Sequence, residues 1–325
     1  MPFPDGAARD GGAAGALQTM DKSYVDLQIN GYMGVDFSDP ALTEDQFLTA
    51  ADHIFASGTS LFLPTIVTSP REVYLRNLGI MRRAAESRGL LKNIPGAHLE
   101  GPFISPEPGA VGAHIPEYVR RPDCAFFDEI MERSGNYVRI LTVAPEVPGM
   151  EELISRASAA GVVVSCGHQL AGSADLDRAA KAGAKLLTHL GNGCPNLIDR
   201  HRNMIWAGMA CDALTAMIIA DGHHLPAELV KCIIRCKGVD RVIVTSDAAP
   251  IAGFPPGRYE CWNNDAILEP DGRFHNPSKG CLVGSSYCMR KCAEFLGAIG
   301  YGEEEIDRMT VRNPLGILGL ETLPR

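Results

Sequence analysis

The chain has 325 residues, 46% apolar and 21% charged, an ordinary globular balance with enough apolar material for one large core. Its formal net charge is −9 and no run of Lys or Arg exceeds two, so we expect no nucleic-acid partner. No stretch approaches about 20 uninterrupted apolar residues, so we expect no membrane-spanning segment. Residues 1–22 are rich in Gly and Ala and lack the pattern of a secretory signal, which predicts a disordered lead-in.

Ten cysteines occur without any Cys-x-x-Cys pair. Because no export signal accompanies them, we interpret them as reduced thiols, buried or half-buried, in a cytoplasmic protein. Two pairs, Cys232/Cys236 and Cys288/Cys292, have a spacing of four that places each pair on one helix face. A cysteine metal site is the less favoured alternative.

Short β-branched apolar runs alternate with amphipathic stretches along the chain. The strand candidates are Tyr24–Asn30, Ser60–Val67, Ile94–Glu100, Tyr137–Ala144, Gly161–His168, Lys185–His189, Leu214–Ala220 and Arg241–Asp247. The helical patterns are Glu44–Phe55, Arg71–Arg88, Met150–Ala159, Ala174–Ala182, Ala227–Cys236, Ser286–Leu296 and Glu303–Leu318. Eight strands alternating with helices predict an α/β fold, a single (β/α)8 TIM barrel over residues 23–325.

Two long stretches fit neither a helix nor a strand and are interpreted as irregular. Pro102–Asp123 follows Glu100 directly, and Pro250–Gly284 comes soon after Asp247. Loops of this length are uncommon in a compact domain unless they cover or bind something. Both follow the carboxyl end of a predicted strand, which is the end where the active site of a barrel lies.

Six of the eight predicted strands end in polar side chains. The run that closes at Glu100 is followed at once by Gly101-Pro102, a strand end with a sharp turn. Taken alone, a terminal Glu is more often a solvated strand end than a ligand. Because the carboxyl ends of barrel strands meet at one face, we expect the polar ends to converge. They are Gln28 with Asn30, Glu100, His168, His189, Asp221 with His224, and Asp247.

Three of these side chains form a recognisable ligand set. Glu100, His168 and His189 supply one carboxylate and two imidazoles, which leave an open position on Zn²⁺. Each histidine alone is more often a satisfied core or loop residue, but the barrel and the residue types together favour a metal site. We therefore predict one divalent ion, with Zn²⁺ preferred and Fe²⁺, Mn²⁺ or Co²⁺ left open. Asp247 is placed to take a proton from an activated water and pass it on.

The arrangement resembles the amidohydrolase superfamily and, within it, the N-acetylglucosamine-6-phosphate deacetylases. The segment His98-Leu99-Glu100-Gly101-Pro102-Phe103 is similar to their most specific signature. Gln28-Ile29-Asn30-Gly31 stands where most of the superfamily carries a His-x-His metal pair, as in those deacetylases. Ser246-Asp247-Ala248 matches their general acid/base strand, and the resemblance spans about residues 24 to 320. It implies metal-dependent hydrolysis of the acetamide of an N-acetyl amino sugar.

The same resemblance implies roles for residues around the substrate. His114 corresponds to a histidine that polarises the acetyl carbonyl, which makes it catalytic beside Asp247. Arg202 corresponds to an arginine that contacts phosphate and can reach in from a neighbouring subunit, which implies a homodimer. The implied substrate-binding residues are Ala113, Asn192, Gly193, Arg202, His224 and Leu282.

The chain also departs from the family pattern. We expect a barrel without the small β-sandwich that family members usually carry. Gly193-Cys194 replaces the usual Ala-Met, and Asn203-Met204 follows Arg202 in place of Glu-Pro. These changes leave the metal and acid/base residues intact. They lie on the rim of the site, where the substrate would be recognised. We expect N-acetylglucosamine 6-phosphate to be converted to glucosamine 6-phosphate and acetate.

Two alternatives stay open at this point. The first is a deacetylase of a related N-acetylated amino sugar without the 6-phosphate, because the altered residues lie on the substrate rim. The second is a non-catalytic sugar-binding relative of the family. The intact set of Glu100, His168, His189 and Asp247 argues against that second alternative.

Overall fold

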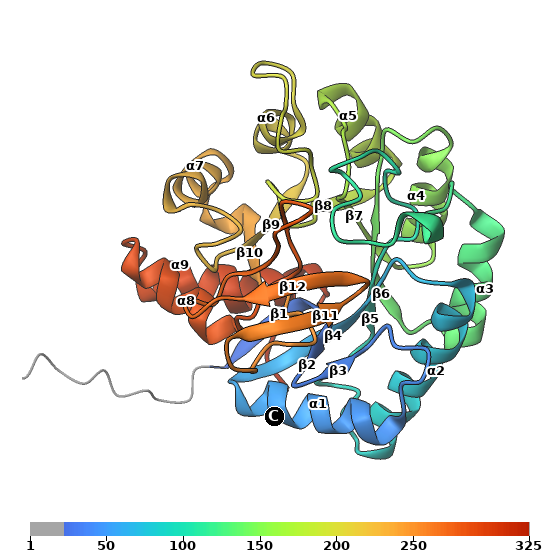
Figure 1. Ribbon diagram of the computed structural model, residues 1–325. Helices are drawn as coiled ribbons and strands as arrows, with labels where there is room; N and C mark the ends of the chain where they lie inside the picture. The colour runs from blue at the N-terminus through green and yellow to red at the C-terminus, as the bar shows by residue number, and fades with distance from the viewer. Residues whose placement is uncertain (1–22, 325) are drawn as a thin grey trace, which may run out of the picture.

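The computed structural model describes residues 23–324, which form a (β/α)8 barrel (Figure 1). The predicted lead-in, residues 1–22, lies outside the described residues. Eight parallel strands surround the barrel axis in chain order, and each coincides with a predicted strand. They are β1 (Tyr24–Ile29), β4 (Thr59–Val67), β5 (Ala97–Glu100), β6 (Val138–Val143), β7 (Val163–Cys166), β8 (Ala184–Leu187), β9 (Thr215–Ile219) and β10 (Val242–Thr245). The predicted TIM barrel is confirmed.

Helices surround the strands and include two that the sequence patterns did not reveal. These are α3 (Cys124–Ser134), which begins at the end of a stretch interpreted as a loop, and α6 (Met204–Ala210), too short to show a helical period. The predicted terminal helix is interrupted by a π-helical turn at Arg308–Arg312. The other helices are α1 (Glu44–Ala56), α2 (Arg71–Ser87), α4 (Met150–Ala159), α5 (Ser173–Ala182), α7 (Ala227–Lys237), α8 (Met289–Ala298), α9 (Glu303–Asp307) and α10 (Asn313–Ile317).

Apolar side chains fill the barrel away from its carboxyl end. Val25, Leu61 and Ile243 belong to an interior cluster that Leu315 of α10 closes. A larger cluster lies between strands and helices, and α1 contributes the face that contains Phe47 and Ile54. With the interior filled in this way, the polar side chains are left at the carboxyl ends of the strands.

The stretch Pro250–Gly284 is not irregular, and its interpretation as a loop was wrong. It holds an antiparallel sheet of β11 (Gly257–Cys261), β12 (Asn264–Leu268), β13 (Phe274–Asn276) and β14 (Cys281–Leu282), which Figure 1 shows in orange. The hairpin between β11 and β12 turns at Trp262 and Asn263, with φ of 50° and 57°. This pair lacks the Asn-Gly or Asp-Gly signal that marks such turns in a sequence. In Pro102–Asp123 the described backbone contains only a 3₁₀ turn, Pro116–Tyr118, as its irregular pattern predicted.

A short hairpin of β2 (Gly31–Tyr32) and β3 (Val35–Asp36) follows β1. The sheet order begins at β1 and ends at β10, so the barrel closes between these two strands. The Asp247 N–H donates to the Gln28 carbonyl at 3.0 Å, and the Asn30 N–H donates to the Ala248 carbonyl at 2.9 Å. These backbone hydrogen bonds join the carboxyl ends of the first and last strands.

All ten cysteines are free thiols. Cys232 and Cys236 are exposed, so the prediction of buried or half-buried thiols was wrong for this pair. Helix α7 turns Val230, Ile233 and Ile234 toward the barrel, which leaves the face with both cysteines in solvent. Among residues 23–324, no helix is long and apolar enough to cross a membrane.

Candidate active site

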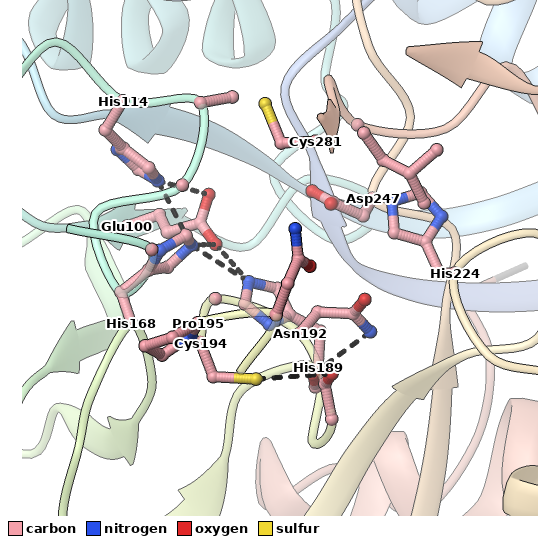
Figure 2. A pocket seen from close by; sticks show the side chains of 18 of the residues that line it. Glu100, His114, His168, His189, Asn192, Cys194, Pro195, His224, Asp247 and Cys281 are labelled. Carbon is pink, nitrogen blue, oxygen red and sulfur yellow. Dashed lines mark hydrogen bonds and ion pairs between the residues drawn. The ribbon is translucent and has the colours of Figure 1, made fainter. Parts of the chain in front are cut away.

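A pocket of about 380 Å³ lies at the carboxyl end of the barrel (Figure 2). Its walls come from the strand ends, the loop after β5, the loop after β8 and the antiparallel sheet. All the predicted site residues except Gln28 and Arg202 line it. Those lining it are Asn30, Glu100, Ala113, His114, His168, His189, Asn192, Gly193, His224, Asp247 and Leu282.

Glu100, His168 and His189 bring three potential ligand atoms together. Oε1 of Glu100 lies 3.2 Å from Nε2 of His168 and 2.8 Å from Nε2 of His189. The two Nε2 atoms are 3.1 Å apart, and all three side chains are buried. Nδ1 of His168 donates to the Ala110 carbonyl at 2.7 Å, which leaves the lone pair on Nε2. The donor set and its orientation fit a divalent metal.

The electrostatics of the same cluster also favour a cation. Burial raises the pKa of Glu100, but the neighbouring imidazoles of His168 and His189 outweigh it and hold the pKa well below its ordinary value. Burial lowers the pKa of His189, but its hydrogen bond to Glu100 outweighs that effect and the net direction is upward. Glu100 is therefore a carboxylate that attracts positive charge at this point of the pocket.

His114 faces the cluster with a different tautomer from that of His168. Its Nδ1 accepts a hydrogen bond from the Thr68 N–H at 3.1 Å, so the proton of the neutral ring is on Nε2. Burial and the neighbouring His168 lower the pKa of His114 to about 3, which keeps the ring neutral. Nε2 lies 3.2 Å from Nε2 of His168. His114 therefore presents an N–H donor beside the ligand set.

Asp247 lies across the pocket from His114 (Figure 2). Two amide side chains hold its carboxylate. Nε2 of Gln28 donates to Oδ1 of Asp247 at 3.0 Å and to Oε1 of Glu100 at 2.7 Å. Nδ2 of Asn30 donates to the same Oδ1 at 2.7 Å. Burial and the charge of Glu100 raise the pKa of Asp247 to about 7, which suits a group that takes and returns a proton. The Gln28 amide thus bridges Glu100 and Asp247, and the Asn30 amide donates to Asp247 alone.

Three of the site residues leave their strands with left-handed backbone. His168, His189 and Asp247 have φ of 50°, 28° and 51°. Residues other than Gly seldom adopt this conformation, although His and Asp do so more often than most, and such residues cluster at functional sites. Each of the three follows a strand end, where the change of direction places its side chain in the pocket. Strand alternation in the sequence does not show this turn.

His224 is oriented by Asp221, which Ser285 holds in turn. Its Nδ1 donates to Oδ2 of Asp221 at 2.7 Å, and the Ser285 hydroxyl donates to the same oxygen at 3.0 Å. Oδ1 of Asp221 accepts from the backbone N–H of His224 at 2.8 Å. Charge pairing with His224 and these hydrogen bonds outweigh burial and lower the pKa of Asp221. His224 therefore presents its remaining ring nitrogen from a fixed position.

The rim of the pocket contains residues that sequence reasoning missed. Trp262 comes from the antiparallel sheet, and Ile198 comes from the loop after β8. Nε1 of Trp262 donates to Oδ2 of Asp36 at 2.9 Å, which ties the sheet to the hairpin after β1. Because the sheet itself was not predicted, no local signal pointed to Trp262.

Arg202 lies outside the pocket of its own chain. It is exposed, and its N–H donates to Oδ1 of Asp199 at 2.7 Å in the loop before α6. Leu197 in the same loop is 93% exposed. In the described part of the chain, no Lys or Arg lines the pocket. Arg202 therefore does not reach the pocket of its own chain in this structure.

A parallel barrel with a buried Glu–His–His cluster and a carboxylate opposite defines a hydrolytic enzyme of the amidohydrolase superfamily. No family model matches the chain. It is 34% identical over 313 residues to the N-acetylglucosamine-6-phosphate deacetylase of Bos taurus, covering 92% of this chain and 74% of the bovine protein. It is 30% identical over 304 residues to the N-acetylgalactosamine-6-phosphate deacetylase of Escherichia coli O157:H7, covering 92% and 78%.

A solved structure of a mutant N-acetyl-D-glucosamine-6-phosphate deacetylase from Mycobacterium smegmatis, in complex with N-acetyl-D-glucosamine-6-phosphate, superposes with a TM-score of 0.83. The two are 28% identical over 91% of this chain and 77% of that chain. The Thermotoga maritima N-acetylglucosamine-6-phosphate deacetylase gives a TM-score of 0.80 at 27% identity, over 91% and 78%. The chain belongs to the N-acetylglucosamine-6-phosphate deacetylase family.

Proposed function

We propose that this chain hydrolyses the acetamide of N-acetylglucosamine 6-phosphate to glucosamine 6-phosphate and acetate. The observation that carries the proposal is the placement of Asp247 opposite Glu100, His168 and His189 in one buried pocket. The named relatives support it, since the bovine protein matches most of this chain in sequence and the Mycobacterium smegmatis protein matches most of it in fold. Zn²⁺ is the ion that we propose for the Glu–His–His set, because it accepts this mixture of nitrogen and oxygen ligands.

A divalent ion on these ligands supplies Lewis acidity, which makes water a nucleophile near neutral pH. Asp247 takes a proton from the attacking water while the water oxygen forms a bond to the acetyl carbon. Nε2–H of His114 donates to the carbonyl oxygen as negative charge develops there. Asp247 then gives the proton to the sugar nitrogen as the C–N bond breaks. Acetate and the free amino sugar are the products.

We further propose that the sugar phosphate is bound by His224 and, in a homodimer, by Arg202 of a second copy. The absence of Lys and Arg from the pocket wall of residues 23–324 supports a contribution from outside the chain. An arginine fork suits phosphate geometry. Sedimentation velocity tests the dimer. In a dimer with Arg202→Ala in both copies, we expect KM to rise for the phosphorylated sugar and to stay unchanged for N-acetylglucosamine. Equal changes in the two KM values would refute the phosphate role of Arg202.

A second candidate is deacetylation of an N-acetyl amino sugar without the 6-phosphate. The same lack of Lys and Arg in the pocket wall of residues 23–324 favours it, and so do the altered neighbours of Arg202. The two candidates predict opposite preferences in kcat/KM for phosphorylated and unphosphorylated N-acetylglucosamine. N-acetylgalactosamine 6-phosphate belongs in the same comparison, since one relative is named for it.

The decisive experiment measures acetate release from these three sugars by the zinc-loaded protein and by Asp247→Asn. We expect the wild-type protein to release acetate and the variant to lose activity by at least about 10²-fold, as for other acid–base residues. A variant that binds sugar and releases acetate at the wild-type rate would overturn the mechanism. A wild-type protein that binds sugar without any turnover would identify a binding relative instead. Cytoplasmic location stays a prediction from the sequence.

A further inference from the structure

A fully buried carboxylate, Asp26 of β1, lies outside the pocket wall. Its oxygens accept hydrogen bonds from the Thr245 hydroxyl at 2.6 Å and the Ser246 hydroxyl at 2.5 Å. They also accept from the backbone N–H groups of Ser246 and Gln28, each at 3.2 Å. Burial raises the pKa of Asp26, and these hydrogen bonds act in the opposite direction. The mechanism assigns this carboxylate no role, although burying one is costly.

The donors to Asp26 are concentrated at one point of the chain. Thr245 and Ser246 are the two residues that precede Asp247, and they contribute three of the four hydrogen bonds. The Ser246 hydroxyl also accepts from the N–H of Ala248, at 3.2 Å. One hydroxyl therefore connects Asp26 to the residues on both sides of Asp247.

Asp247 needs such support because its backbone is in an unusual conformation. Its φ is 51°, in the left-handed region that residues other than Gly seldom adopt. Its N–H donates to the Gln28 carbonyl, and its carbonyl accepts from the Ser285 N–H at 2.9 Å. The side chain reaches the pocket from this turn. A change in the turn therefore moves the carboxylate relative to Gln28 and Asn30.

We infer that Asp26 is a positioning residue for Asp247, acting through the hydroxyls of Thr245 and Ser246 to hold its left-handed turn. The effect on rate rests on the proposed deacetylase function, whereas the effect on geometry does not. Closure of the barrel alone does not account for the arrangement, because the backbone hydrogen bonds of Asp247 and Asn30 already join β1 to the end of β10. The buried carboxylate adds bonds on Ser246, directly beside Asp247.

The test compares Ser246→Ala with a matched control, Ser134→Ala. Ser134 is equally buried on α3, its hydroxyl donates to the Met131 carbonyl at 3.2 Å, and it accepts from the Tyr137 N–H at 3.2 Å. Both substitutions thus remove a buried serine hydroxyl that bonds on two sides. We expect Ser246→Ala to lower kcat about 10-fold or more, the effect of losing a hydrogen bond to a charged group. Its KM and zinc content should match the wild-type values, and Ser134→Ala should leave kcat unchanged.

A double-mutant cycle separates positioning from general damage. If Ser246 acts through Asp247, Ser246→Ala should have no further effect on kcat in an Asp247→Asn background. Independent multiplication of the two losses would overturn the inference, as would equal kcat for Ser246→Ala and Ser134→Ala. Asp26→Asn should reproduce the loss in kcat, and if that variant does not fold, Ser246→Ala decides the question.

A readout that needs no activity completes the test. A crystal structure of zinc-loaded Ser246→Ala should show Asp247 out of its left-handed conformation or its carboxylate away from Gln28 and Asn30. An unmoved Asp247 would refute the positioning role. Absence of acetate release by the wild-type protein would instead refute the proposed function, and the crystal structure would still decide the role of Asp26.

Discussion

The backbone N–H of Thr68 donates to Nδ1 of His114 and thereby determines which ring nitrogen carries the proton. With Nδ1 occupied as an acceptor, the neutral ring has its hydrogen on Nε2. His168 is the opposite case, since its Nδ1 donates to the Ala110 carbonyl and its Nε2 is free to bind a metal. Backbone groups thus make His114 an N–H donor and leave its spatial neighbour His168 with a nitrogen lone pair for a metal.

His114→Ala tests this assignment. We expect kcat to fall about 10²- to 10³-fold, the effect of removing one donor to a developing oxyanion. Zinc content should stay at the wild-type level, because the ligands are on other residues. Steady-state kinetics and metal analysis of the same preparation measure both quantities. Loss of zinc together with activity would show that His114 is a ligand instead.

His189→Ala should abolish metal binding. The wild-type protein is expected to gain thermal stability on zinc addition, by about 2.7 kcal/mol when zinc is at 100 times its Kd. The variant should show no such gain, because Glu100 and His168 alone leave the ion with too few ligands. Calorimetry of metal-free protein with and without zinc measures the shift. Asp247→Asn is the control that should keep it, and an equal gain in His189→Ala would contradict the assigned site.

Asn30→Ala should move the acid limb of the kcat–pH profile upward. Asp247 must be ionised to accept a proton, so activity rises as pH increases through its pKa. The hydrogen bond from Asn30 lowers that pKa against the effects of burial and Glu100, and its removal raises it further. Asn77→Ala removes a buried amide that bonds the Phe37 and Asp39 carbonyls, and serves as the control for lost stability. An acid limb at the same pH in Asn30→Ala and wild type would count against Asp247 as the base.

Asp36 should make the free energy of unfolding depend on pH. Burial raises the pKa of Asp36 to about 6, compared with about 3.9 in an unfolded chain. Below pH 4 the protonated Asp36 carboxyl therefore stabilises the folded protein. That contribution to the free energy of unfolding is lost as pH rises through 6. The advantage of metal-free Asp36→Asn over wild type should increase by up to about 3 kcal/mol between pH 4 and 7. Urea unfolding measures it, the exposed Asp45→Asn is the control, and a flat difference would contradict the raised pKa.

Local patterns were sufficient for the strands and for three candidate metal ligands that the structure brings together. Each strand buries a short apolar run, and Glu100, His168 and His189 come at or just after the ends of such runs. A parallel barrel places all its carboxyl ends on one face, so position along the chain determined position in space. Periodicity failed for β11–β14, because the turn at Trp262 and Asn263 has no local signal.

Tertiary structure alone decided how the site residues are oriented. Thr68 meets His114 from a different strand end, and Ser246 meets Asp26 from the opposite end of the chain. The left-handed turn of Asp247 likewise depends on partners distant in sequence. Burial periodicity is encoded residue by residue, so the sequence by itself determined the barrel and its polar face. A hydrogen bond between distant segments forms only once both segments are packed. The tautomer of His114, the turn at Asp247 and the hydrogen bonds of Asp26 are therefore visible only in the folded chain.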